Sequence, residues 1–140
     1  MPTARQDSGA AHIPGLGVLV VGGSVEKEFD SPPNERDAEI LKFDNLSSED
    51  EMTWIKISPL LKSRSMVSAV YFDGSVYVSS AEDETIEMLS LPSGQPGQWT
   101  LLSSCDTEDR IPYCLGVFKG KMFATGKLLF TFLSLSFGIF

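Results

Sequence analysis

The sequence predicts an all-β protein built from repeated units of four short antiparallel strands. Its apolar runs are short, rich in Val, Ile, Phe and Tyr, and separated by clusters of Gly, Pro, Ser and Asp, which is typical of strands joined by turns. Three such runs are Gly17–Val21, 72–78 and 120–124. No window of about a dozen residues keeps an apolar stripe at helical spacing with a cap at each end, so helices should be few.

The three runs recur in register, which indicates an internal repeat. Each has a glycine that we expect to open a turn, and a pair of small residues follows this glycine five positions later. An Arg lies upstream of each turn glycine, and a Trp lies between successive runs. The turn glycines are Gly17, Gly74 and Gly120, the small pairs are Gly22-Gly23, Ser79-Ser80 and Thr125-Gly126, the arginines are Arg5, Arg64 and Arg110, and the tryptophans are Trp54 and Trp99.

This order of residues resembles the kelch repeat, in which an Arg, an apolar strand, a turn glycine, a strand ending in Gly-Gly, an acidic strand and a Trp follow one another. A kelch unit is about 50 residues long and forms one four-stranded blade of a β-propeller. The resemblance implies a partial kelch-type β-propeller with four-stranded antiparallel blades and an incomplete ring. A propeller closes with about four to eight blades, and this chain holds about two and a half units.

The repeat is expected to cover residues 1–126, with units at about 5–63, 64–109 and 110–126. Trp54 and Trp99 should fill blade cores at equivalent positions. Residues 127–140 form an apolar tail without the kelch pattern, and it is too short to span a bilayer, which takes about 20 residues. We favour a translated intron or shifted frame for this tail over a genuine hydrophobic tail or an unusual terminal strand. We expect the chain to be a piece of a longer kelch protein.

Composition excludes several classes of partner. The 140 residues contain 11 Lys+Arg and 19 Asp+Glu, which gives a formal net charge of −8. This balance argues against a nucleic-acid binder, because affinity for phosphates depends on Lys and Arg, and it disfavours docking on anionic membranes. No apolar leader opens the sequence and two cysteines cannot form a disulfide framework, so we expect a reducing, cytoplasmic location.

The chemistry-bearing residues do not predict an enzyme. Cys105 and Cys114 have a spacing that matches no zinc-ligand pair, and His12 is the sole histidine, whereas a copper site of the kind in kelch-containing oxidases needs at least two imidazoles. The sequence contains no nucleophile elbow, phosphate loop or complete dinucleotide fingerprint. We therefore expect no catalytic residues, no metal, no cofactor and no small-molecule substrate.

The kelch resemblance implies a non-catalytic protein–protein interaction module. The parent protein would be a substrate adaptor of a cullin-type ubiquitin ligase or a scaffold; the alternatives are an actin-binding cytoskeletal protein and a truncated product without function. The family presents links and loops from one face to its partners. On this chain the corresponding binding residues are Arg5, Ser24, Arg64, Ser65 and Arg110. For the three arginines we favour a repeated ion pair or loop brace over partner contact.

Acidic residues gather in the expected loops. Residues 26–51 hold ten Asp and Glu against three Lys and Arg, and residues 82–109 hold another seven, beginning with Glu82-Asp83-Glu84. The simplest interpretation is a solvated loop surface. The functional alternative is an acidic rim that attracts a basic peptide of a partner protein.

Overall fold

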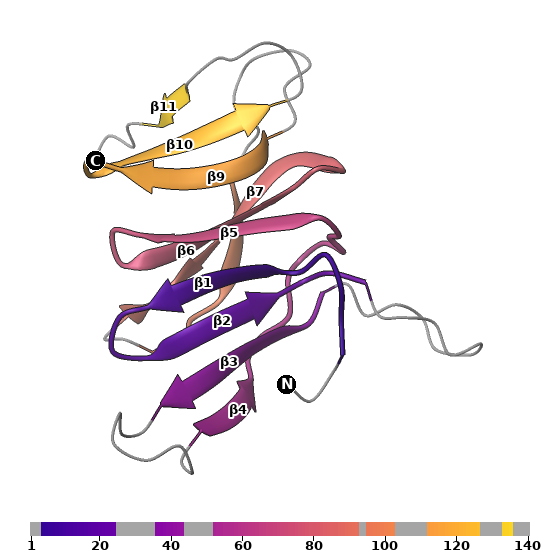
Figure 1. The fold of residues 1–140 in the computed structure, drawn as a ribbon, viewed down its shortest axis with the longest axis vertical. Helices are drawn as coiled ribbons and strands as arrows, with labels where there is room; N and C mark the ends of the chain where they lie inside the picture. The colour runs from indigo at the N-terminus through magenta and orange to yellow at the C-terminus, as the bar shows by residue number, and fades with distance from the viewer. Residues whose placement is uncertain are drawn as a thin grey trace, which may run out of the picture.

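Strands form in the apolar runs and assemble into three separate antiparallel sheets (Figure 1). The computed structural model describes residues 4–24, 36–43, 52–92, 95–102, 112–126 and 133–135. The first sheet has the strand order β1-β2-β3-β4. Its strands are β1 (Gly9–Ile13), β2 (Gly17–Val21), β3 (Ala38–Phe43) and β4 (Met52–Lys56).

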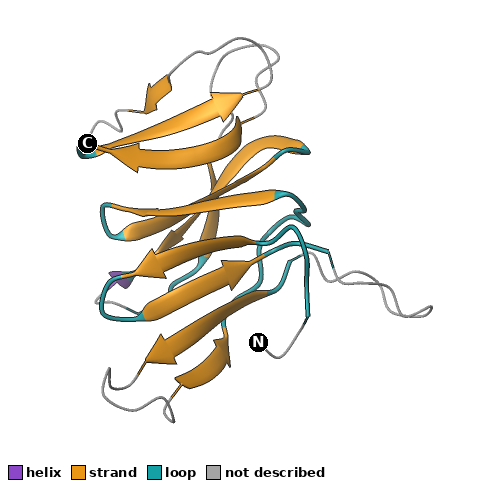
Figure 2. Ribbon diagram, viewed as in Figure 1, coloured by secondary structure: helices purple, strands orange, loops and turns teal. Residues whose placement is uncertain are grey.

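The second sheet repeats this arrangement in the order β5-β6-β7-β8, and the third has the order β11-β10-β9. The strands of the second sheet are β5 (Val67–Phe72), β6 (Ser75–Ser80), β7 (Asp83–Ser90) and β8 (Trp99–Leu102). Those of the third are β9 (Pro112–Phe118), β10 (Lys121–Gly126) and β11 (Leu133–Leu135). No described residue lies in an α-helix, the short helical segment in Figure 2 being a 3-10 turn at Pro92, and the sheets close no ring. The predicted all-β architecture of four-stranded antiparallel sheets in an incomplete ring is confirmed.

The described part of the C-terminal tail is a strand. Residues 133–135 form β11 and pair with β10 in antiparallel register. A terminal strand was the least favoured of the three interpretations of the tail. Residues 127–132 and 136–140 lie outside the described residues.

The two four-stranded sheets are equivalent in their pairing. Trp54 of β4 pairs with Leu41 of β3, and Trp99 of β8 pairs with Leu89 of β7. The acidic residue two positions before each leucine, Glu39 or Glu87, pairs with a valine of the second strand. The two tryptophans therefore occupy the same position in successive sheets.

Each four-stranded sheet thus has one face that carries its tryptophan, because directly paired side chains lie on the same face. We call it the tryptophan face. In the first sheet it consists of Ala10, His12, Val18, Val20, Glu39, Leu41, Trp54 and Lys56. In the second sheet it consists, in the same order, of Ala69, Tyr71, Val76, Val78, Glu87, Leu89, Trp99 and Leu101.

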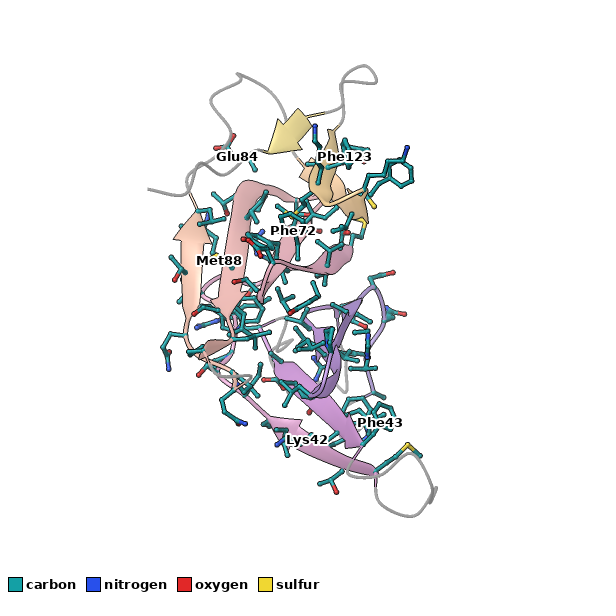
Figure 3. All side chains as sticks on the ribbon, turned by 90° about the vertical axis from the view of Figure 1, so that its left-hand side faces the viewer. Lys42, Phe43, Phe72, Glu84, Met88 and Phe123 are labelled. Carbon is teal, nitrogen blue, oxygen red and sulfur yellow. The ribbon has the colours of Figure 1, made fainter. Side chains whose placement is uncertain are left out.

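The three sheets stack face to face with their first strands, β1, β5 and β9, side by side (Figure 1). One core lies between the first two sheets, where Leu19 and Ile40 of the first meet the tryptophan face of the second. A second core lies between the second and third sheets and includes Met122, with Phe72 and Met88 packed against it (Figure 3). The second sheet is therefore buried on both faces.

The hairpin turns explain one difference from the predicted register. Gly74 and Gly120 are the second residues of two-residue turns in which both residues have positive φ, as type I′ turns require. The first hairpin has a three-residue turn, and Gly17 is the first residue of β2 instead of opening that turn. Residues that are equivalent in strand pairing therefore lie one position closer to Gly17 in the first sheet than to Gly74 in the second. Gly22 matches Ser80 in the second sheet and Gly126 in the third.

Candidate functional site

Two kinds of connection meet at one edge of the stack. In an antiparallel sheet of sequential strands, successive connections lie at opposite edges, so alternate connections share an edge. The connection from the second to the third strand therefore shares an edge with the link that leads from the fourth strand to the next sheet. We call this the link edge; its described parts are residues 22–24, 36–37, 57–66 and 81–82 (Figure 1, on the right of the first two sheets).

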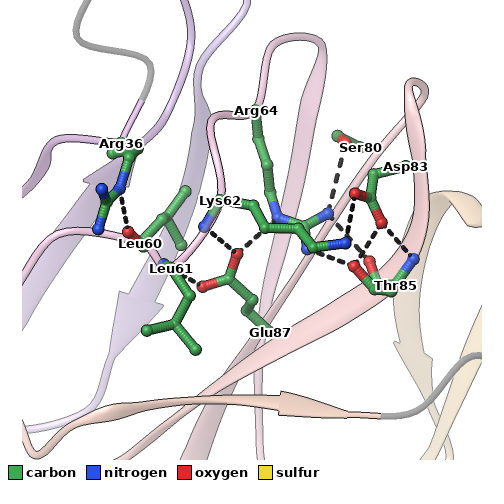
Figure 4. A network of polar contacts seen from close by, with 9 residues as sticks. All are labelled: Arg36, Leu60, Leu61, Lys62, Arg64, Ser80, Asp83, Thr85 and Glu87. Atoms are coloured by element: carbon green, nitrogen blue, oxygen red, sulfur yellow. Dashed lines mark hydrogen bonds and ion pairs between the residues drawn. The ribbon is translucent and has the colours of Figure 1, made fainter.

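Arg64 fastens the link to the second sheet (Figure 4). Its side chain is fully buried, and its Nε donates a hydrogen bond to Oε1 of Glu87 at 2.9 Å. Its Nη1 donates to the carbonyl of Thr85 at 2.9 Å and to Oγ of Ser80 at 3.4 Å, and its Nη2 donates to Oγ1 of Thr85 at 2.9 Å. Three residues of the second sheet, Ser80, Thr85 and Glu87, therefore hydrogen-bond to one guanidinium group.

Glu87 completes this attachment from the other side. Its Oε2 accepts a hydrogen bond from the backbone N–H of Leu61 at 2.7 Å, and its Oε1 accepts one from that of Lys62 at 3.1 Å. The carboxylate is fully buried, and its charge is compensated by Arg64 and by two link amides. A buried ion pair with such additional hydrogen bonds fixes the link in one conformation, because moving any member would leave a charge desolvated and unpaired.

Arg5 makes the matching attachment in the first sheet. Its Nη2 lies 3.2 Å from Oε2 of Glu39, and both side chains are almost completely buried. Its Nη1 donates to the carbonyls of Asp37 at 3.0 Å and Gly22 at 3.3 Å, which match Thr85 and Ser80 of the second sheet. We call each arrangement the arginine clamp of its sheet.

The two clamps differ in their supporting donors. Among the described residues, neither carboxylate oxygen of Glu39 accepts a hydrogen bond, whereas Glu87 accepts two from the link. The positions that match Leu61 and Lys62 by their distance from the clamp arginine are residues 2 and 3, which lie outside the described part of the chain.

The glycine pair Gly22-Gly23 joins the first sheet to the second arginine clamp. The N–H of Gly23 donates to the carbonyl of Arg64 at 2.8 Å. Gly23 has a φ of 85°, and a Cβ there would lie 2.5 Å from the carbonyl oxygen of Gln6. Only glycine fits this close approach without displacing the backbone. Gly23 is therefore required by chain packing at the link edge.

The kelch resemblance implies five residues for partner binding, and the structure describes four of them, two arginines that are buried and two serines that are half-buried. Arg5 and Arg64 are buried in the arginine clamps, so their guanidinium groups are not available to a partner. This placement corresponds to the ion-pair brace that we favoured for them. Ser24, which pairs with Gln6 in an isolated bridge, and Ser65 are half-buried. Arg110 lies outside the described residues.

A shallow acidic hollow lies beside the second clamp. It is lined by Lys62, Glu82, Asp83 and Glu84, and the side chains of Glu82 and Glu84 are exposed. Nζ of Lys62 donates to Oδ2 of Asp83 at 2.8 Å, and both the backbone N–H and the hydroxyl of Thr85 donate to Oδ1 (Figure 4). Three carboxylates and one ammonium leave this part of the link edge negative.

The hydrogen bonds at Asp83 keep it ionised. Burial alone would raise its pKa, but hydrogen bonds from Lys62 and Thr85, together with the nearby charge of Arg64, outweigh burial and lower the pKa from 3.8 to about 2. Asp83 therefore stays ionised throughout the physiological pH range. A fixed negative patch attracts cationic side chains by simple Coulomb interaction.

Sequence reasoning missed the partners of the clamp arginines. Neither Glu39 nor Glu87 was singled out from the sequence, although they stand at the same place in both units. A repeated glutamate and a repeated arginine inside an otherwise apolar pattern were the available signal, because charged residues are rarely buried unless they are paired. Their pairing is a long-range contact that the spacing alone did not show.

Comparison with known proteins assigns no family: no protein-family model matches the chain, and a search of curated proteins finds no significant relative. Within the described ranges, no three His, Cys, Asp or Glu side chains are grouped closely enough to hold a metal ion. The described part of the chain also contains no helix with the length and apolarity needed to cross a membrane.

Proposed function

We propose that the protein is a non-catalytic interaction module of the kelch-propeller type, whose link edge binds a basic segment of a partner protein. The observation that carries the proposal is the arginine clamp, which recurs at the same position in two successive sheets. A clamp of two buried charged residues is a costly device for folding alone. Its effect is to hold the connections at the link edge in one conformation.

A fixed edge is what a binding surface requires. Ordering a flexible loop on association costs free energy that is lost from affinity, so a preorganised edge binds more tightly for the same contacts. The clamp of the second sheet leaves the exposed side chains of Glu82 and Glu84, with half-buried Lys62, beside a link whose backbone is held by Glu87. These exposed side chains, not the clamp arginines, would contact the partner.

The charge of the edge selects the partner's chemistry. The described acidic hollow contains three carboxylates, and the whole chain carries a formal net charge of −8. Complementary charge accelerates encounter and excludes acidic competitors. A Lys- or Arg-rich segment is therefore the proposed ligand.

Site-specific photo-crosslinking in cells tests this proposal. A photoreactive amino acid replaces Glu84 at the link edge, and Asp73, an exposed residue of a hairpin turn at the opposite edge, is the matched control. We expect a protein adduct at position 84 whose crosslinked peptide is basic, and no such adduct at position 73. Equal adducts at both positions, no adduct, or an acidic peptide at position 84 would contradict the proposal.

The identity of the captured protein also decides the cellular role. A cullin-ligase substrate, an actin subunit and a scaffold component are the partners that the kelch resemblance implies. We propose a cytoplasmic location for the protein, which the free, exposed thiol of Cys114 supports because such thiols persist in reducing compartments.

A further inference from the structure

Two exposed leucines adjoin the buried carboxylate of Glu87. Leu61 lies in the link and is 50% exposed, and Leu101 of β8 is 42% exposed. The N–H of Leu61 donates to Oε2 of Glu87 at 2.7 Å, and Leu101 is the direct strand partner of Glu87 on the tryptophan face of the second sheet. The Cβ atoms of directly paired residues lie about 5 Å apart. We call Leu61 and Leu101 the leucine pair.

The packing of the repeat does not explain the leucine pair. At the position of Leu101 the first sheet has Lys56, whose side chain is 62% exposed and forms an ion pair with Asp37. A charged residue therefore suits this position in the fold, whereas a leucine there remains in contact with water. Because the second sheet already has a neighbouring sheet on each face (Figure 1), its exposed leucine is not a site for a further sheet.

The leucine pair and the acidic hollow are neighbours along the link. Leu61 and Lys62 are consecutive residues, and Glu87 accepts a hydrogen bond from the backbone N–H of each. In Figure 4 the side chain of Lys62 extends toward Asp83, whereas the side chain of Leu61 points in another direction. One fixed stretch of the link therefore presents an apolar side chain immediately beside the border of a negative hollow.

We propose that the basic segment bound at the link edge carries a large apolar side chain that packs on the leucine pair. This inference rests on the proposed function and specifies its ligand. Charge complementarity argues for this occupant, because the exposed carboxylates of Glu82 and Glu84 attract a Lys or Arg of the segment and so bring its neighbouring residues onto the leucines. A wholly polar segment would leave both leucines in contact with water.

The apolar contact and the charges have separate effects on binding. Complementary charges accelerate the encounter and exclude acidic competitors, but salt screens them. Burial of an apolar side chain against the leucine pair slows dissociation, and salt does not screen it. Added salt should therefore weaken binding of the segment without abolishing it, whereas a purely electrostatic ligand would be released.

Selection of a random-peptide phage library on the full chain tests the proposal. Enriched peptides should combine Lys or Arg with one large apolar residue at a constant spacing. Calorimetric titration of one enriched peptide then completes a double-mutant cycle. Replacing its apolar residue by serine should weaken binding to the unsubstituted chain about tenfold, and should change binding to the variant Leu61→Ser/Leu101→Thr little.

Two controls accompany the cycle. The circular dichroism spectrum of Leu61→Ser/Leu101→Thr should be unchanged, because neither leucine is buried. Met66→Ser replaces another apolar residue of the link, which is 51% exposed and lies outside the leucine pair. This matched variant should keep the full difference between the two peptides.

The outcomes separate this inference from the proposed function. Basic peptides without a constant apolar residue, or an equal loss of affinity on the double variant, overturn the role of the leucine pair and leave the basic ligand standing. Enriched peptides that Glu82→Gln/Glu84→Gln does not weaken contradict the proposed function, and no enrichment contradicts both. A mass in light scattering that falls to 15.3 kDa only when the leucine pair is replaced indicates a second copy as the occupant, which also overturns the inference.

Discussion

Replacement of Arg64 by methionine should destabilise the protein more than any other single change at the link edge. The methionine keeps the apolar stem but removes hydrogen bonds to Glu87, Thr85 and Ser80, and it leaves a fully buried carboxylate with only backbone donors. Breaking a buried pair in this way costs about 3–5 kcal/mol. For a urea slope of about 2 kcal/mol/M, the unfolding midpoint should fall by about 2 M.

Urea unfolding at fixed protein concentration, followed by tryptophan fluorescence, measures this loss. Lys62→Met is the control, because the Lys62 side chain is 40% exposed and its ion pair with Asp83 should contribute under about 1 kcal/mol. Adding Glu87→Gln to Arg64→Met should recover part of the stability, since the amide is neutral and its one oxygen still accepts one of the two link N–H groups. If Arg64→Met costs no more than Lys62→Met, the clamp does not hold the link as argued.

Three further outcomes are expected. Trp99→Ala should cost about 3–5 kcal/mol in thermal unfolding because Trp99 is 5% exposed, and Trp54→Ala should cost clearly less because Trp54 is half-buried; equal losses would contradict this difference in burial. Gly23→Ala should lower the urea midpoint more than Gly74→Ala, since both glycines have positive φ but only Gly23 lacks room for a Cβ. Because the pKa of Asp83 is lowered from 3.8 to about 2, its contribution is present above pH 3.8 and is lost as the pH falls toward 2. Asp83→Asn should therefore be less stable than the unsubstituted protein by up to about 1 kcal/mol at neutral pH, after allowance for solvent screening, and equal to it near pH 2.

The strands and the repeat were predictable because they depend on local pattern. Apolar residues in Gly17–Val21 alternate between two faces, and glycines mark the turns, so no tertiary knowledge is needed to place them. The offset of one residue at Gly17 was not predictable, because a three-residue and a two-residue turn are both compatible with the glycines present.

The candidate site was harder to predict because it is made by contacts that are remote in sequence. Arg64 and Glu87 are 23 residues apart, and Arg5 reaches a carbonyl 32 residues away. A sequence pattern can suggest that an arginine forms a structural ion pair, but it does not identify the carboxylate with which the arginine pairs. The acidic hollow is likewise set by the β6–β7 turn, which brings Glu82 and Asp83 next to Lys62 of the link.

The burial of the tryptophan face in the second sheet also constrains what can cover the first. The first sheet and the link that follows it supply all the described contacts on the tryptophan face of the second sheet. Apolar residues of the first sheet cover Leu89, the link amides donate to Glu87, and a link carbonyl accepts a hydrogen bond from Trp99. An extended peptide has the width of a single strand, about 5 Å, whereas Val20, Trp54 and the residues between them span all but the first strand of their sheet. Only a partner with several adjacent strands matches that surface.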